Sequence, residues 1–510
     1  MKKTLAFLIC ALFVLTAFLA CTPKDPGNNP ADTSAVETKN GEQQTEAQTA
    51  EPVETKDLAY EIDEEIKARK DDFKNYTLNI LASENTGDWP ADDLYREEDS
   101  DEALDSAIYN RNLNVKEKYG FTVNVTGTST PSADVKLAVN SNVTDYDVVV
   151  YTAHEMCVDA LSNMFLDLTQ IDTINLKKKY WDQSLYEGLN IDGKLFYTTG
   201  DISTKAAAGT FICIYNKKVA ESYDYEGDVF YDMVENKEWT LDRLIEIVKE
   251  VHYIDDGDSK VGPEDFYPLA IQIEDYLAFF FGAGGHIITR DESGMPVYGL
   301  NEAGNKTAEI IDKIYNLTKK DNQSIDAHDY IPYLNEHGSF ASSDAFKDNR
   351  ALFYFTNASN LLGLREMESD FGVLPMPMFD NNQGGYYCYV YWSAALFAIP
   401  SNMTARSEFI GFALEAMADE SRKILTPAYY EVTLKTKGQR DWKSQEMFDI
   451  ACQNRVWDLG YTGSMSLANI GQLFIDQIKK GSGSLANFNK SKERSTNKAI
   501  DKLLKAYNKS

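Results

Sequence analysis

Beyond residue 75 the pattern of apolar and polar positions alternates between strand and helix. Residues 77–82 are strand-like, and alternation over residues 121–125 predicts a second strand. The β-branched run Tyr-Asp-Val-Val-Val-Tyr at residues 146–151 is typical of a strand buried on both faces of a parallel sheet. Between the first two strands, residues 101–119 predict a helix whose apolar face consists of Leu104, Ile108, Val115 and Tyr119. This order predicts a doubly wound α/β lobe.

A separate apolar run, from Leu5 to Ala20, lies at the start of the chain behind two lysines. It is too short and wrongly flanked for a stable bilayer span, so residues 1–20 are predicted to be a signal peptide. The following Phe-Leu-Ala-Cys, which ends at Cys21, resembles the bacterial lipobox. That resemblance implies lipidation of Cys21 and a membrane anchor. A simple secretory signal cleaved nearby is the alternative.

Residues 22–57 contain almost no large apolar side chain. Such a segment buries too little surface to offset the entropy lost on ordering, so it is predicted to be disordered. Together with Cys21 it would form a polar tether, residues 21–57, between the lipid and the folded body.

The remaining roughly 450 residues exceed what one hydrophobic core normally serves, so two lobes are expected. The net charge of −30 argues against nucleic acid and against adsorption to anionic lipid. Aromatic residues make up 12% of the chain, including 30 Tyr. Exposed aromatic rings suit the faces of sugars, although most of these side chains must simply fill the core.

The body carries four cysteines, each alone in its stretch of sequence: Cys157, Cys213, Cys388 and Cys452. This sparse pattern favours buried free thiols over a disulfide scaffold, while pairing stays open. The stretch from His154 to Cys157 begins like a zinc-protease motif, but no second His follows at the required spacing. No nucleophile elbow, P-loop or dinucleotide fingerprint occurs. The sequence therefore predicts neither an enzyme nor a cofactor.

An acidic stretch at residues 254–265 is similar to an EF-hand calcium loop. Asp256, Asp258 and Asp265 would take its third, fifth and twelfth positions. However, Ile254 occupies the first position and Ser259 replaces the glycine. We interpret the stretch as a degenerate loop and predict no metal site.

A series of short motifs, in this order, resembles the extracellular solute-binding proteins of ABC importers, of the maltose and oligosaccharide type (family 1). The motifs are residues 147–150 with 161–169, Ile-Asp-Gly-Lys-Leu-Phe-Tyr at 191–197, Ile-Tyr-Asn-Lys-Lys at 214–218, Glu-Trp-Thr-Leu-Asp at 238–242, residues 346–355, and Gly-Val-Leu-Pro-Met-Pro at 372–377. The resemblance covers essentially the whole body.

The resemblance implies a two-lobed α/β fold of the type II periplasmic-binding-protein class. The N-terminal lobe would comprise residues 75–200 and 392–435, and the C-terminal lobe residues 201–390 and 436–510. Crossover strands are expected near residues 196–201 and 387–394. The ligand is expected in a cleft between the lobes, outside the carboxyl ends of the strands.

Candidate ligand-binding residues lie at these strand ends and crossovers. They are Tyr151, Thr152, His154, Glu155, Asp201, Asn357, Tyr391 and Trp392. Tyr389, Tyr391 and Trp392 would form an aromatic row for stacking on pyranose rings. The alternatives are structural: helix-start contacts for Glu155, a turn cap for Asp201, and core packing for the aromatic residues. Asn357 stands where the family often presents an aromatic residue.

The sequence thus predicts a monomeric, lipid-anchored receptor on the outer face of the cell membrane, or in the periplasm. It would capture a small solute, with an oligosaccharide the leading candidate, close around it and deliver it to an ABC permease. A non-transporting surface adhesin or receptor is the first alternative. A secreted glycosidase is the second, with Glu155 and Asp201 as its two carboxylates.

Overall fold

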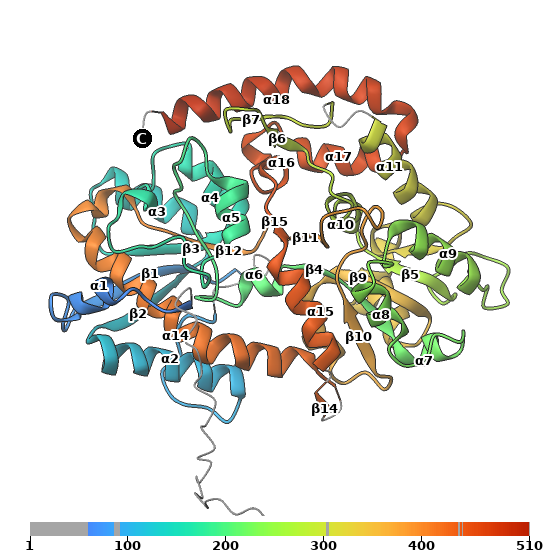
Figure 1. Ribbon diagram of the computed structural model, residues 1–510, viewed down its shortest axis with the longest axis horizontal. Coiled ribbons are helices and arrows are strands. Elements are labelled where there is room, and N and C mark those ends of the chain that lie inside the picture. Colours follow the sequence, from blue (N-terminus) through green and yellow to red (C-terminus); the bar gives the residue numbers. More distant parts are fainter. Residues whose placement is uncertain (1–59, 86–91, 302–304, 437–438, 441, 509–510) are drawn as a thin grey trace, which may run out of the picture. The chain divides into compact units, whose positions relative to one another are not determined.

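The computed structural model describes residues 60–85, 92–301, 305–436, 439–440 and 442–508 (Figure 1). The predicted signal peptide, Cys21 and the predicted tether lie outside these residues. None of the helices in the described part of the chain combines the length and apolar content that crossing a membrane requires.

The first lobe is built on a four-stranded sheet in the order β12-β3-β1-β2. β1 (Thr77–Ser83) is parallel to β2 (Thr122–Thr128) and to β3 (Val148–Thr152). β12 (Ala395–Ala398) returns from far along the chain and pairs antiparallel with β3. The three strands predicted at 77–82, 121–125 and 146–151 are therefore confirmed in a mixed, mainly parallel sheet.

Alternate side chains of this sheet enter two different hydrophobic clusters. Ile80 and Val150 point to the cluster that Phe409 and Phe412 of α14 (Ser407–Leu434) complete, whereas Leu81 belongs to the cluster on the other face. The predicted helix is α2 (Ala103–Tyr119), which lies beside α14 (Figure 1). Its predicted apolar face is buried except for the half-buried first member. The lobe also contains α1 (Glu64–Lys67), α3 (Pro131–Asn140), α4 (Ala153–Ala160) and α5 (Gln183–Leu189).

The second lobe is built on a five-stranded sheet in the order β10-β4-β9-β5-β8. β9 is parallel to β5 and antiparallel to β4, and β4 is antiparallel to β10. β4, β5, β9 and β10 are buried along their whole length, as expected for a sheet covered on both faces. The strands are β4 (Phe211–Asn216), β5 (Tyr267–Ile271), β8 (Ser324–Asp326), β9 (Ala351–Asn357) and β10 (Phe371–Leu374).

Helices of the second lobe begin at clear local signals. Thr240 caps α9 (Leu241–Val251) by accepting a hydrogen bond from the Arg243 N–H, and the helix buries an apolar row at helical spacing. The other elements are α6 (Lys205–Ala208), α7 (Lys217–Glu221), α8 (Val229–Glu235), α10 (Asp275–Gly282), β6 (Ile288–Arg290), β7 (Pro296–Tyr298), α11 (Asn305–Thr318), α12 (Ile331–His337) and α13 (Ala341–Lys347).

The connections between the sheets run side by side. The Thr198 N–H donates to the Phe397 carbonyl at 2.9 Å, and Thr210 forms a bridge with Val390. Gly200 has φ +154°, and a Cβ there would lie 2.0 Å from the Tyr180 carbonyl oxygen, so only glycine fits. Gly200 therefore allows the backbone of the preceding segment, at Tyr180, to approach closely.

The chain after α14 forms a set of helices. α15 (Trp442–Gln453) packs on the second sheet, and α17 (Ile470–Ile478) contacts α10 and α11. α18 (Leu485–Tyr507) lies along β7 and α17 (Figure 1). The smaller elements are β11 (Cys388–Tyr389), β13 (Lys435–Thr436), β14 (Gln439–Arg440), β15 (Arg455–Val456) and α16 (Leu459–Thr462).

All four body cysteines are free thiols. Cys157, Cys213 and Cys388 are buried, and Cys452 is half-buried. The expectation of unpaired thiols is confirmed. Burial raises the pKa of Cys157 and of Cys388 to about 12, so neither is a reactive thiolate.

Candidate functional site

Strand ends from both sheets meet at one edge. β3 ends at Thr152 in the first lobe, and β5 and β9, which are parallel, end at Ile271 and Asn357 in the second. The crossover segment joins them: the Tyr391 N–H donates to the Gly209 carbonyl at 2.9 Å, and the His154 N–H donates to the Trp392 carbonyl at 3.3 Å. This is the edge where open α/β sheets hold their ligands.

Aromatic side chains line this edge. The Trp392 indole stacks on the His154 imidazole, with ring centres 5.0 Å apart and an interplanar angle of 23°, and lies 5.3 Å from the Tyr391 ring. Both Tyr391 and Trp392 are half-buried. Tyr389 is buried and stacks on Phe211 at 4.3 Å. The predicted aromatic row is therefore divided, since Tyr389 belongs to the core while Tyr391 and Trp392 keep exposed surface.

His154 is held between the two lobes. Its Nε2 lies 2.8 Å from the Tyr461 carbonyl oxygen, so it is the nitrogen that carries the proton and donates. Burial lowers the pKa of His154 to about 4. The imidazole is therefore neutral at physiological pH. It packs against Trp392 on one side and is hydrogen-bonded to Tyr461 of α16 on the other.

Two half-buried carboxylates accompany the aromatic rings. Glu155 follows β3, and the Thr152 hydroxyl donates to its Oε2 at 3.4 Å. Glu274 follows β5, and burial raises its pKa. The Glu274 charge adds to the effect of burial in raising the pKa of Tyr391, which places Glu274 near that ring. Glu274 was not among the predicted site residues, although an apolar strand followed by an acid is the signal that singled out Glu155.

Two other predicted residues, Tyr151 and Asn357, have structural contacts. Tyr151 is buried, and its hydroxyl donates to Asp159 Oδ2 at 2.7 Å. Asn357 caps the turn that follows β9, since its Oδ1 accepts from the Ser359 N–H at 3.2 Å.

Asp201 lies against α14. Its Oδ2 is 3.7 Å from Arg422 Nε, and its Oδ1 accepts from the Thr426 hydroxyl at 3.1 Å. Burial raises the pKa of Asp201 to about 6 although Arg422 opposes the shift. These contacts join the first crossover to α14.

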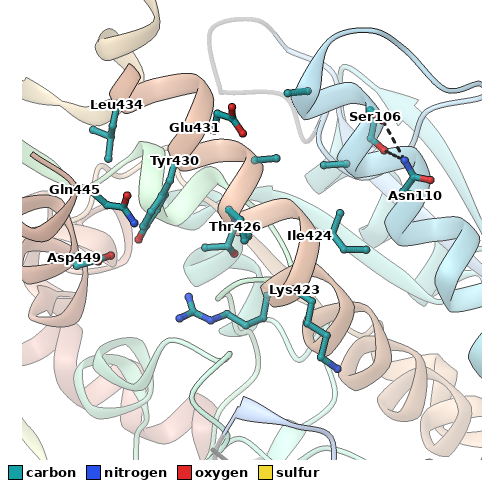
Figure 2. Close-up of a pocket in the computed structure, with 15 residues that line it drawn as sticks. Ser106, Asn110, Lys423, Ile424, Thr426, Tyr430, Glu431, Leu434, Gln445 and Asp449 are labelled. Carbon is teal, nitrogen blue, oxygen red and sulfur yellow. Dashed lines mark hydrogen bonds between the residues drawn. The ribbon is translucent and has the colours of Figure 1, made fainter. Parts of the chain in front are cut away.

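Two cavities lie near these residues. One, of about 670 Å³, follows α14 between α2 and α15, and Figure 2 shows Tyr430 pointing from α14 toward Gln445 and Asp449. The other, of about 620 Å³, lies between α5 and the hairpin of β6 and β7. Within the described part of the chain, Tyr391 and Trp392 line neither. Phe281 lines the second cavity, and its ring lies 5.4 Å from that of the buried Tyr389.

The acidic loop at 254–265 is arranged differently from the calcium loop it resembles. Asp265 is buried and closes the loop, accepting from the Tyr253 hydroxyl at 2.6 Å and from the Asp256 N–H at 2.9 Å. The exposed carboxylates that lie within 4.8 Å of one another belong to Asp255, Asp256 and Asp258. The Asp265 carboxylate therefore stabilises the loop through these hydrogen bonds.

Comparison with known proteins bears on the fold and the family. Among solved structures, a cyclo/maltodextrin-binding protein complexed with maltotetraose is 14% identical, with 84% of this chain and 97% of that chain covered and a TM-score of 0.50. UspC of M. tuberculosis is 12% identical, with 84% and 100% covered and a TM-score of 0.50. These likenesses show the two-lobed α/β fold. No curated protein matches the chain.

The sequence of the chain also matches the model of a protein family. The model described as bacterial extracellular solute-binding protein matches residues 114–424, which is more than half of the chain. The match spans β3, the second sheet, the Trp392 crossover and most of α14. This chain belongs to the bacterial extracellular solute-binding proteins, a family of binding proteins.

Proposed function

We propose that this protein captures a sugar or an oligosaccharide at the edge formed by Tyr391 and Trp392, and delivers it to the membrane subunits of an ABC importer. The family supports solute capture. The sugar assignment draws support from the structural neighbour complexed with maltotetraose and from the composition of the edge.

The observation that carries the proposal is the pairing of half-buried aromatic rings with carboxylates. Trp392 and Tyr391 offer ring faces on which the apolar C–H face of a pyranose packs. Glu155 and Glu274 offer oxygens that accept hydrogen bonds from sugar hydroxyls, and charge-assisted bonds of this kind are the stronger ones. Few polar groups at fixed positions on a largely apolar wall are typical of small-molecule sites.

Binding would be coupled to hinge closure. Glu155 belongs to the first lobe and Glu274 to the second, so a ligand that contacts both is held better when the lobes approach each other. A ligand shifts a conformational equilibrium only through such differential contacts. The closed form would then be the one that the permease recognises.

We further propose the lobe boundaries predicted from the sequence, a monomeric state, and attachment of the body to the outer face of the membrane through lipidated Cys21. The apolar run before Cys21 and the polar stretch after it support this anchor. A glycosidase with Glu155 and Asp201 as its carboxylates gains no support, because Asp201 meets Arg422 and Thr426 of α14.

Replacing Trp392 tests the site. We expect Trp392→Ala to weaken binding of maltotetraose or a longer glucan by about tenfold or more, because it removes a stacking face of the type that dominates binding energies. Isothermal titration calorimetry measures the affinity. Trp442→Ala is the matched control, since Trp442 is 60% exposed on α15. Equal affinity of the Trp392→Ala variant and the unaltered protein would place the sugar elsewhere.

A further inference from the structure

The middle of the segment from Arg455 to Tyr507 is firmly attached to the second lobe. The Phe474 ring lies 4.8 Å from that of Phe280 in α10, and Lys479 Nζ is 3.0 Å from the buried Asp326 carboxylate at the end of β8. Near the start of α18, Asn489 Oδ1 accepts from the buried Tyr298 hydroxyl at 3.0 Å. These contacts fix α17 and the start of α18 to the second lobe.

The last turn of α18 is attached to the first lobe. The Lys194 ammonium donates to the Tyr507 carbonyl at 2.7 Å, and the Phe196 ring packs edge-on against the Tyr507 ring at 4.8 Å. The hydroxyls of Tyr507 and Tyr197 are 3.4 Å apart. Tyr507 is only 3% exposed, so this end of the helix is docked rather than loosely apposed.

The start of the segment also contacts the first lobe. Arg455 Nη1 lies 3.0 Å from Oδ2 of the buried Asp182 at the start of α5, and the Trp457 indole N–H donates to the same oxygen at 3.3 Å. A Cβ on Gly188 of α5 would lie 2.2 Å from the Trp457 carbonyl oxygen, which shows how closely the two backbones approach.

Arg290 makes a further connection between the second lobe and α5 of the first lobe. Arg290, on the β6 strand of the second lobe, donates to the Glu187, Gly188 and Asn190 carbonyls at 3.1, 3.0 and 2.6 Å. Glu187 and Gly188 belong to the last turn of α5, where carbonyls lack helical partners, and Asn190 is the C-cap residue, so Arg290 caps a first-lobe helix from the other lobe.

We propose that α18 is a strap that holds the two lobes together and moves with the second lobe. Asn489 and Tyr507 are separated by about 27 Å of continuous helix, at the usual rise per residue. A helix is stiff over this length, so separating the lobes requires one end to detach. The Tyr507 end has fewer anchoring contacts than the end held by α17, and it is the end that releases.

The strap lies after residue 424, where the family match ends. Its effect is to raise the closed fraction of the ligand-free protein. Since apparent affinity scales with the fraction of the binding-competent form, contacts far from the ligand would set how tightly and how slowly this receptor binds.

The test is hydrogen exchange of the ligand-free protein, read by mass spectrometry, for Tyr507→Ala. We expect exchange in α5 and in residues 455–466 to become at least about threefold faster, because the lobes part more often when the strap is released. Lys505→Ala, an exposed position in the same turn, is the matched control and should exchange like the unaltered protein.

Lys194→Met is the second variant, because it weakens the same contact from the first lobe while leaving α18 unchanged. It should accelerate the same peptides. Acceleration confined to the last turn of α18 and to residues 194–197 would overturn the strap, since it would mean local fraying without lobe separation. The measurement uses no ligand, so its outcome is independent of whether a sugar binds at Trp392.

Discussion

Glu415 shows how a single buried side chain organises the entry to the first crossover. Its carboxylate is fully buried in α14 and accepts from the Trp181 indole N–H at 2.7 Å, the Asn175 N–H at 2.9 Å and the Tyr180 hydroxyl. These three donors belong to the segment that leads to Asp182 and α5. Burial raises the pKa of Glu415 to about 7 despite the donors, because the charged form loses its hydration.

This pKa has a direct consequence for stability. The folded protein binds the Glu415 proton more tightly than the unfolded chain, whose pKa is near 4.5. The resulting contribution is complete below pH 4.5 and is lost as the pH rises through about 7. We expect Glu415→Gln, which is neutral at every pH, to remove this part of the pH dependence. Melting temperatures at pH 5 and pH 8 should differ less in Glu415→Gln than in the unaltered protein; an identical difference would contradict the assignment.

At the scale of residues, the sequence located strand ends better than side-chain directions. Thr152, His154, Glu155, Tyr391 and Trp392 do lie at the edge where two sheets meet. The Tyr151 side chain points into the core toward Asp159, and the Asn357 side chain caps the turn that follows it. The pattern of apolar and polar residues along the chain does not show where Asp159 or the Ser359 N–H lies in space. It therefore cannot distinguish a residue that contacts ligand from one that packs in the core or caps a turn.

At the scale of elements, the local pattern of apolar and polar residues was sufficient to predict a helix or strand wherever one face of that element is buried. α2 begins at Ala103, two residues after the predicted start, because the acidic residues before it lie outside the helix. β3 begins at Val148, since Asp147 accepts from the Asn79 N–H at 2.9 Å and pairs with Arg406. By contrast, the contacts of α16 to α18 with the first lobe join residues hundreds of positions apart, and no local pattern reports them.

The approach of α5 to the segment after Arg455 gives an element-scale prediction. We expect Gly188→Ala to destabilise the protein by about 1–3 kcal/mol, the usual cost of forcing a methyl group into a packed contact. The added Cβ would lie 2.2 Å from the Trp457 carbonyl oxygen. Gly363→Ala is the control, because nothing lies within 4 Å of its Cβ. Urea unfolding measures both, and equal midpoints would show that the two segments do not press on each other.

At the scale of the molecule, two sheets with separate strand sets contribute to the proposed binding edge. The crossover that carries Tyr391 and Trp392 pairs with residues on both sides, through Gly209 toward the second sheet and through His154 toward the first. A ligand placed there contacts groups that move relative to each other when the lobes rotate. In the proposed function, recognition of the ligand and closure of the lobes would therefore depend on the same few residues.

Capture of a carbohydrate is the function proposed for this protein. Thermal unfolding of the protein against a panel of mono- and oligosaccharides, peptides, polyamines and Ca²⁺ tests it most directly. A ligand present at a hundred times its Kd adds about 2.7 kcal/mol to the apparent stability, which raises the melting temperature visibly. We expect one class of glycan to give this shift and the other compounds to give none. A shift only with a peptide or a polyamine, or no shift with any glycan, would contradict the claim.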